Sequence, residues 1–171
     1  SQWHMAIYSK HPQIKKKTVS IKGERMNNTC IYSDMIINED TVRVYNIHLA
    51  SNWFKNTDYS FIQNPQKEKI KEGIIGITKR MKSSFIKRAE EVEIIKQHMA
   101  DCTYPIIVCG DFNDTPLSYA YNSIKGDLSD AFSISGKGIG DSFVKIPALR
   151  IDYILHDNEL KSSNYQKHKQ V

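Results

Sequence analysis

Two polar residues follow an apolar segment near the middle of the chain, in the order Gly110-Asp111-Phe112-Asn113. The preceding residues 106–109 have the length and composition of a buried strand. Residues two apart on an extended segment point to the same side, so Asp111 and Asn113 are expected to face one ligand together. A carboxylate binds a metal ion or orients a water, and a carboxamide both donates and accepts hydrogen bonds. The same residues equally fit a buried strand that runs into an Asx-rich turn ending at Pro116.

Two further strand-like segments carry polar pairs. Upstream, an alternating segment ends with Asn46 and His48, and downstream an apolar segment contains Arg150 and Asp152. Each pair also has a simpler explanation: His48 fits a structural histidine at a strand end, and Arg150 and Asp152 share one face and fit a local ion pair. If the strand ends meet at one edge of a sheet, these groups join Asp111 in a single site.

In order and spacing, these motifs resemble the endonuclease/exonuclease/phosphatase superfamily, which includes deoxyribonuclease I, abasic-site exonucleases, neutral sphingomyelinases, inositol-phosphate phosphatases and deadenylases. The matching segments are Asn46-Ile47-His48-Leu49, Gly110-Asp111-Phe112-Asn113 and Arg150-Ile151-Asp152-Tyr153, and residues 5–12 are similar to the family's strand and turn ahead of them. The resemblance implies an α+β fold: a deoxyribonuclease I-like, four-layer sandwich of two mostly antiparallel sheets flanked by helices, incomplete at both ends. Residues 1–171 would form one partial domain.

The resemblance implies a metal-dependent hydrolase of phosphate esters, of the phosphodiesterase, nuclease or phosphatase type. In such an enzyme Asp111 would orient or deprotonate the attacking water, Asn113 would hold that water or a phosphoryl oxygen, and His48 would contact the phosphate or the leaving oxygen. Asp152 resembles the carboxylate that pairs with the family's terminal histidine. These four residues are therefore the expected catalytic set.

Supporting residues, cofactor and partner are implied in the same way. Asn46 and Arg150 are expected to contact the catalytic residues and hold them in position. The implied cofactor is a hard divalent cation, Mg²⁺ or Mn²⁺, with Asp111 as a ligand. The expected partner is a phosphate-ester substrate, with nucleic acid among the candidates. The sequence does not distinguish DNA, RNA, lipid head groups and inositol phosphates.

Two motifs of the family have no counterpart in this sequence: an N-terminal Gln-Glu motif, whose glutamate is the main metal ligand, and a C-terminal Ser-Asp-His motif. His168 stands near the place of the second, but lysines flank it, and we interpret it as a solvated residue. Without these groups the 171-residue chain is expected to bind magnesium weakly and to show little or no phosphodiesterase activity. The alternative is a catalytically silent family member that acts as a binding or scaffolding module.

The overall composition is typical of a folded, soluble domain, with 40% hydrophobic and 10% aromatic residues in 171. The net charge of +5 suits a polyanionic substrate but does not establish one, and the basic clusters at 15–17 and 79–88 are interpreted as solvated surfaces. The three cysteines show no ligand spacing and fit reduced thiols, as in the cytoplasm, although an upstream segment could still carry a signal or anchor. No apolar run is long enough to span a bilayer, so no membrane contact is implied.

The expected elements follow from apolar periodicity and turn residues. Strands are predicted near residues 5–9, 17–22, 29–37, 41–49, 106–109, 141–145, 150–155 and 163–171, with a hairpin link at 38–40. A helix around 65–79 is weakened by Gly73 and Gly76. A stronger helix is predicted at 84–99, where Ser83 or Ser84 is the expected N-cap. Its apolar face would consist of Phe85, Ala89, Val92, Ile95 and Met99.

Overall fold

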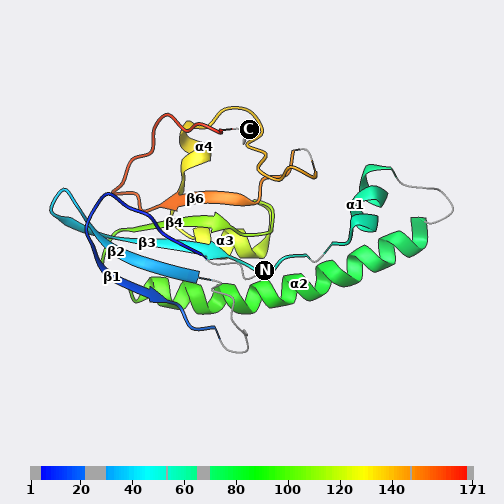
Figure 1. The fold of residues 1–171 in the computed structure, drawn as a ribbon, viewed down its shortest axis with the longest axis horizontal. Helices are drawn as coiled ribbons and strands as arrows, with labels where there is room; N and C mark the ends of the chain where they lie inside the picture. The colour runs from blue at the N-terminus through cyan, green and yellow to red at the C-terminus, as the bar shows by residue number, and fades with distance from the viewer. Residues whose placement is uncertain (1–4, 22–29, 53, 65–69, 147, 169–171) are drawn as a thin grey trace.

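A computed structural model describes residues 5–21, 30–52, 54–64, 70–146 and 148–168, with the backbone alone for 70–72. These residues form a mixed sheet flanked by helices (Figure 1). The strands are β1 (Gln13–Thr18), β2 (Cys30–Ile37), β3 (Asp40–His48), β4 (Ile106–Asp111), β5 (Ser129–Asp130) and β6 (Asp152–His156). The helices are α1 (Asn56–Gln63), α2 (Ile70–Ala100), α3 (Tyr119–Lys125) and α4 (Ala131–Ser135).

The described strands lie in the order β1-β2-β3-β4-β6-β5. Only β3 and β4 run parallel; the other neighbouring pairs are antiparallel. A parallel pair needs a long crossover, and the chain makes it through α1 and α2. As a result, β3 and β4 end at the same edge of the sheet. The mostly antiparallel sheet and its helices agree with the predicted α+β fold, but the described residues form one sheet and do not establish the second sheet of the predicted sandwich.

Helix α2 covers one face of the sheet and supplies part of the core. Its Val92 and Ile95 are fully buried in a cluster that includes Tyr45 and Ile47 of β3. The Tyr45 hydroxyl also lies 2.9 Å from Nδ1 of His98 near the end of α2. Because side chains alternate along a strand, residues 46 and 48 of β3 point away from α2.

Helix α2 replaces the two predicted helices with one continuous element. Gly73 does not interrupt it; a Cβ there would lie 2.8 Å from the Phe61 ring, so the glycine allows α1 to pack against α2. The predicted N-cap at Ser83 or Ser84 is wrong, since Ser84 lies inside the helix and donates to the Ser51 carbonyl. Phe85 is 42% exposed, so the predicted apolar face reaches the core only in its C-terminal half. No helix in the described residues combines the length and apolar composition needed to cross a membrane.

The strand predictions are confirmed at the centre of the sheet and fail at its margins. The hairpin between β2 and β3 turns at residues 38–39 as predicted. The strand expected at 17–22 lies earlier, as β1. Residues 5–9, 141–145 and 163–168 form no strand, and 169–171 lie outside the described residues.

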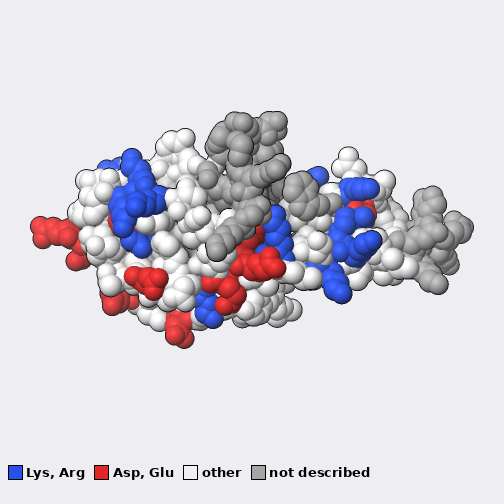
Figure 2. All heavy atoms as spheres, turned by 90° about the horizontal axis from the view of Figure 1, so that it is seen from below, with Lys and Arg blue, Asp and Glu red and all other residues white. Residues whose placement is uncertain are grey.

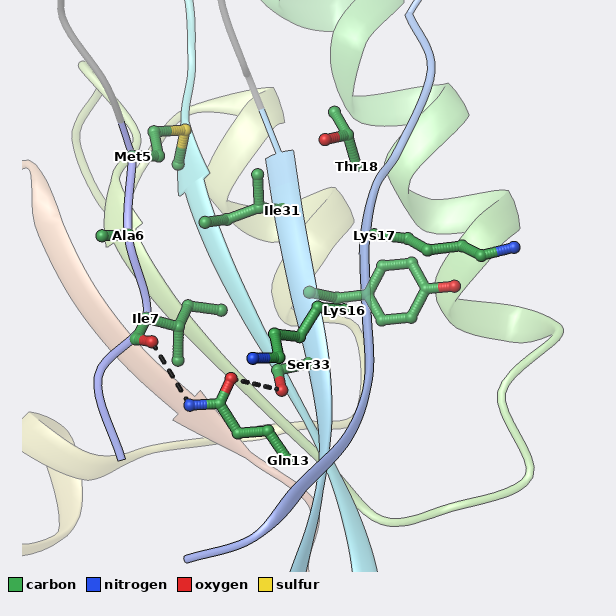
Figure 3. A pocket seen from close by; sticks show the side chains of 10 residues that line it. Met5, Ala6, Ile7, Gln13, Lys16, Lys17, Thr18, Ile31 and Ser33 are labelled. Atoms are coloured by element: carbon green, nitrogen blue, oxygen red, sulfur yellow. Dashed lines mark hydrogen bonds between the residues drawn. The ribbon is translucent and has the colours of Figure 1, made fainter. Parts of the chain in front are cut away.

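Residues 5–9, the N-terminal segment, are bound to the sheet by side-chain hydrogen bonds and do not form a strand. Gln13 is the link: its Nε2 donates to the Ile7 carbonyl, and its Oε1 accepts from the Ser33 hydroxyl of β2 at 3.1 Å. Figure 3 shows these two bonds at the edge of a shallow pocket between the segment, β1 and β2. None of the predicted catalytic residues lines this pocket, and we interpret it as a packing seam.

Candidate active site

Three strand ends bring His48, Asp111 and Asp152 side by side. In the sheet register His48 pairs with Asp111 across β3 and β4, and Asp111 pairs with Asp152 across β4 and β6. Paired residues on neighbouring strands are close enough to interact directly. The sequence prediction placed these residues at strand ends, and the structure shows that the ends meet at one edge of the sheet.

Gly110 makes this convergence sterically feasible. It has φ of 145°, and a Cβ at this position would lie 1.9 Å from the Ile47 carbonyl oxygen. Only glycine accepts both the backbone conformation and the close approach of β3. The next core residue, Phe112, is fully buried, and its ring lies 4.9 Å from that of Tyr153. The loop after β4 is therefore anchored on both sides of Asp111.

The Asp111 carboxyl is half-buried and lies among other charged groups. Burial raises its pKa, and the nearby Asp152 raises it further. The Asn113 backbone N–H, which donates to Asp111 Oδ1 at 2.7 Å, lowers the pKa, as do His48 and Arg88. The balance is a carboxylate whose ionised form is disfavoured and whose orientation is fixed by a backbone hydrogen bond.

Asn113 occupies a left-handed backbone conformation, with φ of 51°. Asparagine is one of the few residues that adopts this region readily. Its Nδ2 donates to the Leu49 carbonyl at 2.9 Å, which ties the carboxamide to the end of β3. Asn113 therefore lies at the same edge as Asp111, but in a turn after β4 and not on the extended segment from which the sequence prediction was made. Its N–H bonded to Asp111 Oδ1 agrees with the alternative, an Asx-rich turn after the strand.

A buried arginine that the sequence interpretation missed supports this edge. Arg88 of α2 is 1% exposed, so its assignment to a solvated basic surface was wrong. Its Nε donates to Asp114 Oδ2 at 2.9 Å, and its Nη1 donates to the Ala50 carbonyl and to Asn52 Oδ1. This network joins the segments after β3 and β4. The only sign of this burial in the sequence is that Arg88 is four residues before Val92 and therefore lies on the same helix face.

Arg150 binds a different partner from the one its neighbours in sequence suggest. It forms a bidentate ion pair with Asp130, at 3.1 and 2.8 Å, and its guanidinium lies 4.7 Å from the Phe132 ring centroid. The alternative explanation, a local ion pair between Arg150 and Asp152, is therefore wrong. Burial alone would raise the pKa of Asp130, but Arg150 and the Tyr121 hydroxyl hold it below its usual range. Arg150 fixes α4 against the start of β6. Its role in supporting the catalytic residues stays a prediction.

The remaining predicted residues are on the side of the sheet away from α2. Asn46 donates from Nδ2 to the Ala6 carbonyl at 3.1 Å, so it holds the N-terminal segment. His48 and Asp152 are exposed to solvent at the edge. Their positions suit contact with a ligand, while Asn46 shapes the surface beside them.

The carboxylates can be tested against the implied metal ion. Proteins commonly hold Mg²⁺ by one or two carboxylates, and waters and substrate phosphates complete its shell. Asp111 and Asp152 are register partners, and the charge of Asp152 raises the pKa of Asp111, so a cation between them would relieve that repulsion. The residues fit a hydrated ion. In the described part of the chain, no group of three or more His, Cys, Asp or Glu side chains could hold a metal by itself.

Comparisons with known proteins identify the family and the fold. The model of the Endonuclease/Exonuclease/phosphatase family matches residues 5–169. A comparison with curated proteins gave no match. Among solved structures, an endonuclease/exonuclease/phosphatase from Bacteroides vulgatus is similar with a TM-score of 0.56 and 15% identity, covering 90% of this chain and 57% of that one.

Two further structures show the same fold. A functionally unknown conserved protein from Enterococcus faecalis V583 has a TM-score of 0.52 and 11% identity, covering 85% of this chain and 54% of its own. The human nocturnin catalytic domain with bound sulfate anion has a TM-score of 0.50 and 15% identity, covering 86% and 48%. At these identities the likeness concerns the fold. The chain spans about half the length of these structures.

Proposed function

Because the chain belongs to the endonuclease/exonuclease/phosphatase family, we propose that the protein is a metal-dependent hydrolase of phosphate esters. The observation that supports this most strongly is the register of β3, β4 and β6, which puts His48, Asp111 and Asp152 next to one another at strand ends. A sheet needs no such cluster for its own stability, since like charges placed opposite each other are destabilising.

In this proposal Asp111 orients or deprotonates the attacking water. Its raised pKa moves it toward the range in which a general base works at neutral pH, and the Asn113 N–H fixes its orientation. Asn113, tied to the end of β3, holds the water or a phosphoryl oxygen. His48 reaches the phosphate or the leaving oxygen from the solvent side.

Asp152 has two roles in this proposal, and they are compatible with each other. It resembles the carboxylate that orients a histidine in the family, and it adds negative charge next to Asp111, which favours cation binding. Mg²⁺ or Mn²⁺ bound there would supply charge neutralisation on the phosphoryl oxygens and stabilise the leaving oxygen. Asp111, with Asp152 beside it, would hold the ion.

The surface charge on the α2 side of the molecule is mixed. Figure 2 shows the α2 side of the molecule, where basic clusters lie on either side of an acidic one. Along α2, the exposed Lys79 and Lys82 are followed by the exposed Glu90 and Glu93. Among the described residues, this face therefore has no continuous basic stripe of the kind that sequence-independent nucleic-acid binding favours. His48 and Asp152 lie on the other side of the sheet, so this pattern does not select a substrate. We propose a phosphate ester in general, with nucleic acid as one candidate.

Residues 1–171 alone are expected to show little or no activity, so the proposal is tested on the whole protein as it is expressed from its gene. The purified protein is assayed for hydrolysis of phosphate mono- and diesters in Mg²⁺ or Mn²⁺. We expect Asp111→Asn to lower turnover by about 10²- to 10⁴-fold, as for the loss of a general base, with an unchanged circular dichroism spectrum. The matched control is Asp127→Asn, which removes an exposed carboxylate away from the site. Near-normal turnover in Asp111→Asn would remove Asp111 from the mechanism. A folded wild-type protein that hydrolyses no ester with either metal would favour the silent binding or scaffolding module.

A further inference from the structure

The N-terminal half of α2 extends past the sheet, and α1 lies against it there (Figure 1). Within the described residues, the buried core takes Val92 and Ile95 from α2 and nothing from α1. The projection is nevertheless firmly held. Asp58 of α1 accepts from the Lys55 N–H at 2.6 Å and pairs with Arg80 of α2. A projection that is fixed by polar contacts but contributes little to the core indicates a role other than packing.

The projection encloses a cavity of about 400 Å³, a size typical of small-molecule sites. Its walls come from α1, α2, the segments that follow β3 and β4, and the loop before β6. The loop is fastened to α1 by a hydrogen bond from Gln63 Nε2 to the Lys145 carbonyl at 3.1 Å. This hydrogen bond joins two walls of the cavity directly.

Aromatic rings form much of the cavity wall. Those that line it are Phe54, Tyr59, Phe85 and Phe143. The Tyr59 ring centroid lies 5.7 Å from that of Phe54 and 6.1 Å from that of Phe143. The ammonium of Lys145 lies 4.5 Å from the Tyr59 ring centroid and adds a positive charge at this wall. Aromatic side chains in a cavity wall suit a flat aromatic group, which packs against them by offset-stacked or edge-to-face contacts.

Polar groups gather on another part of the lining, formed by Asn52, Asn113, Asp114 and Thr115. Arg88 fixes two of them, because it donates to Asn52 Oδ1 and Asp114 Oδ2. A planar ring with polar atoms at its edge would use both the aromatic and the polar lining. An alkyl chain would cover these polar groups without replacing their hydrogen bonds to water, which is unfavourable.

Asn113 connects the cavity to the candidate active site. Asn113 lines the cavity, and the Asn113 backbone N–H donates to Asp111 Oδ1 at 2.7 Å. We propose that this cavity binds an aromatic ring carried by the phosphate ester, so that the substrate is a nucleoside phosphate or an aryl phosphate. The inference rests on the proposed function, because it places the phosphate at Asp111 and the ring beyond Asn113.

Calorimetric binding tests the inference without requiring turnover. Two probes carry an aromatic ring, AMP and phenyl phosphate. Ribose 5-phosphate has no aromatic ring, and octyl phosphate has an alkyl chain in its place. We expect AMP or phenyl phosphate to bind about tenfold more tightly than ribose 5-phosphate, as stacking of one base on an aromatic side chain allows. The better of the two identifies the ring as a nucleobase or a simple aryl group.

Variants then place the ring in the cavity. Tyr59→Leu and Phe143→Leu keep an apolar side chain but remove a ring face, and each is expected to weaken binding of the preferred aromatic ester about tenfold. The matched control is Tyr8→Leu, because Tyr8 is 94% exposed and does not line the cavity. Saturation-transfer NMR of wild-type protein with adenosine adds a measurement that needs neither variant nor phosphate, and ring protons should receive more saturation than ribose protons.

Equal affinity for the aromatic esters and ribose 5-phosphate would overturn the inference, and so would tightest binding of octyl phosphate. Unchanged binding in both leucine variants would do the same. The experiments distinguish failure of the hydrolase proposal from failure of the cavity proposal. A protein that hydrolyses esters but does not prefer the ring loses only the cavity assignment, and a protein that binds the ring but hydrolyses nothing loses only the enzymatic proposal.

Discussion

Gly110→Ala is the substitution that tests the architecture of the site most directly. Gly110 pairs with Ile47 across β3 and β4 and precedes Asp111. An added Cβ would lie 1.9 Å from the Ile47 carbonyl oxygen and 2.7 Å from its nitrogen. Both contacts are with backbone, so no side-chain rotation relieves them. The two parallel strands would have to separate at the point where His48 and Asp111 meet.

The expected loss has two parts. Holding a residue other than glycine at φ of 145° costs about 1–3 kcal/mol, and forcing extra volume into a packed position costs about 1–3 kcal/mol. We therefore expect Gly110→Ala to lower the free energy of unfolding by about 2–6 kcal/mol, a large share of the roughly 5–15 kcal/mol of an ordinary domain.

Urea unfolding followed by far-ultraviolet circular dichroism measures this loss. The control is Gly126→Ala, because Gly126 also has positive φ, at 41°, but no atom lies within 4 Å of the added Cβ. Its ψ of −121° also puts Gly126 outside the left-handed helical region, so that variant should lose only the backbone contribution, about 1–3 kcal/mol. A Gly110→Ala protein that is unfolded, next to a folded Gly126→Ala, agrees with the reasoning. Equal losses in the two variants would refute it, since the close approach of Ile47 would then have no energetic effect.

Three further substitutions probe buried charges. Asp111→Asn should raise stability in metal-free urea titrations at pH 7, because burial raises the pKa of Asp111, and the gain should disappear as pH falls toward the ordinary value of 3.8. Burial and Arg43 lower the pKa of His98, so stability should fall as pH drops below 6.5 toward that lowered pKa, and His98→Gln should flatten this part of the profile. Arg88→Met leaves the Asp114 carboxylate buried without its partner and should cost about 3–5 kcal/mol in urea unfolding, with partial recovery in the double variant with Asp114→Asn.

Each of these expectations has a result that contradicts it. Asp111→Asn would contradict the electrostatic argument by lowering stability at neutral pH. For His98, an unchanged slope of stability against pH below 6.5 would mean that other groups cause it. For Arg88, a loss that Asp114→Asn does not reduce at all would show that packing, and not the buried charge, dominates.

The segments that carry the site were predictable from sequence because their signals are local. Alternation in residues 41–48 and the apolar run at 106–109 define β3 and β4, and the polar residues that follow lie where strands end. A strand's side-chain period is fixed at two, so the face on which His48 lies follows from the buried Ile47 before it. The glycine before Asp111 likewise marks a close backbone approach in sequence alone.

Partners distant in sequence were not predictable. Arg150 and Asp152 are two residues apart, yet Arg150 pairs with Asp130. Arg88 was assigned to solvent because charged residues usually lie there, but its partner Asp114 is 26 positions away. Nothing local distinguishes a buried arginine from a solvated one when the carboxylate that compensates its charge comes from another segment.

The sequence by itself therefore determined which residues end the central strands and on which faces they lie, since both follow from short-range periodicity. Only the tertiary structure decided that three such ends meet in register, that Arg88 links the segments after β3 and β4, and that the α1–α2 projection encloses a cavity beside Asn113. The physical reason is that strand pairing, buried ion pairs and cavities each depend on chain segments that only the folded packing brings together.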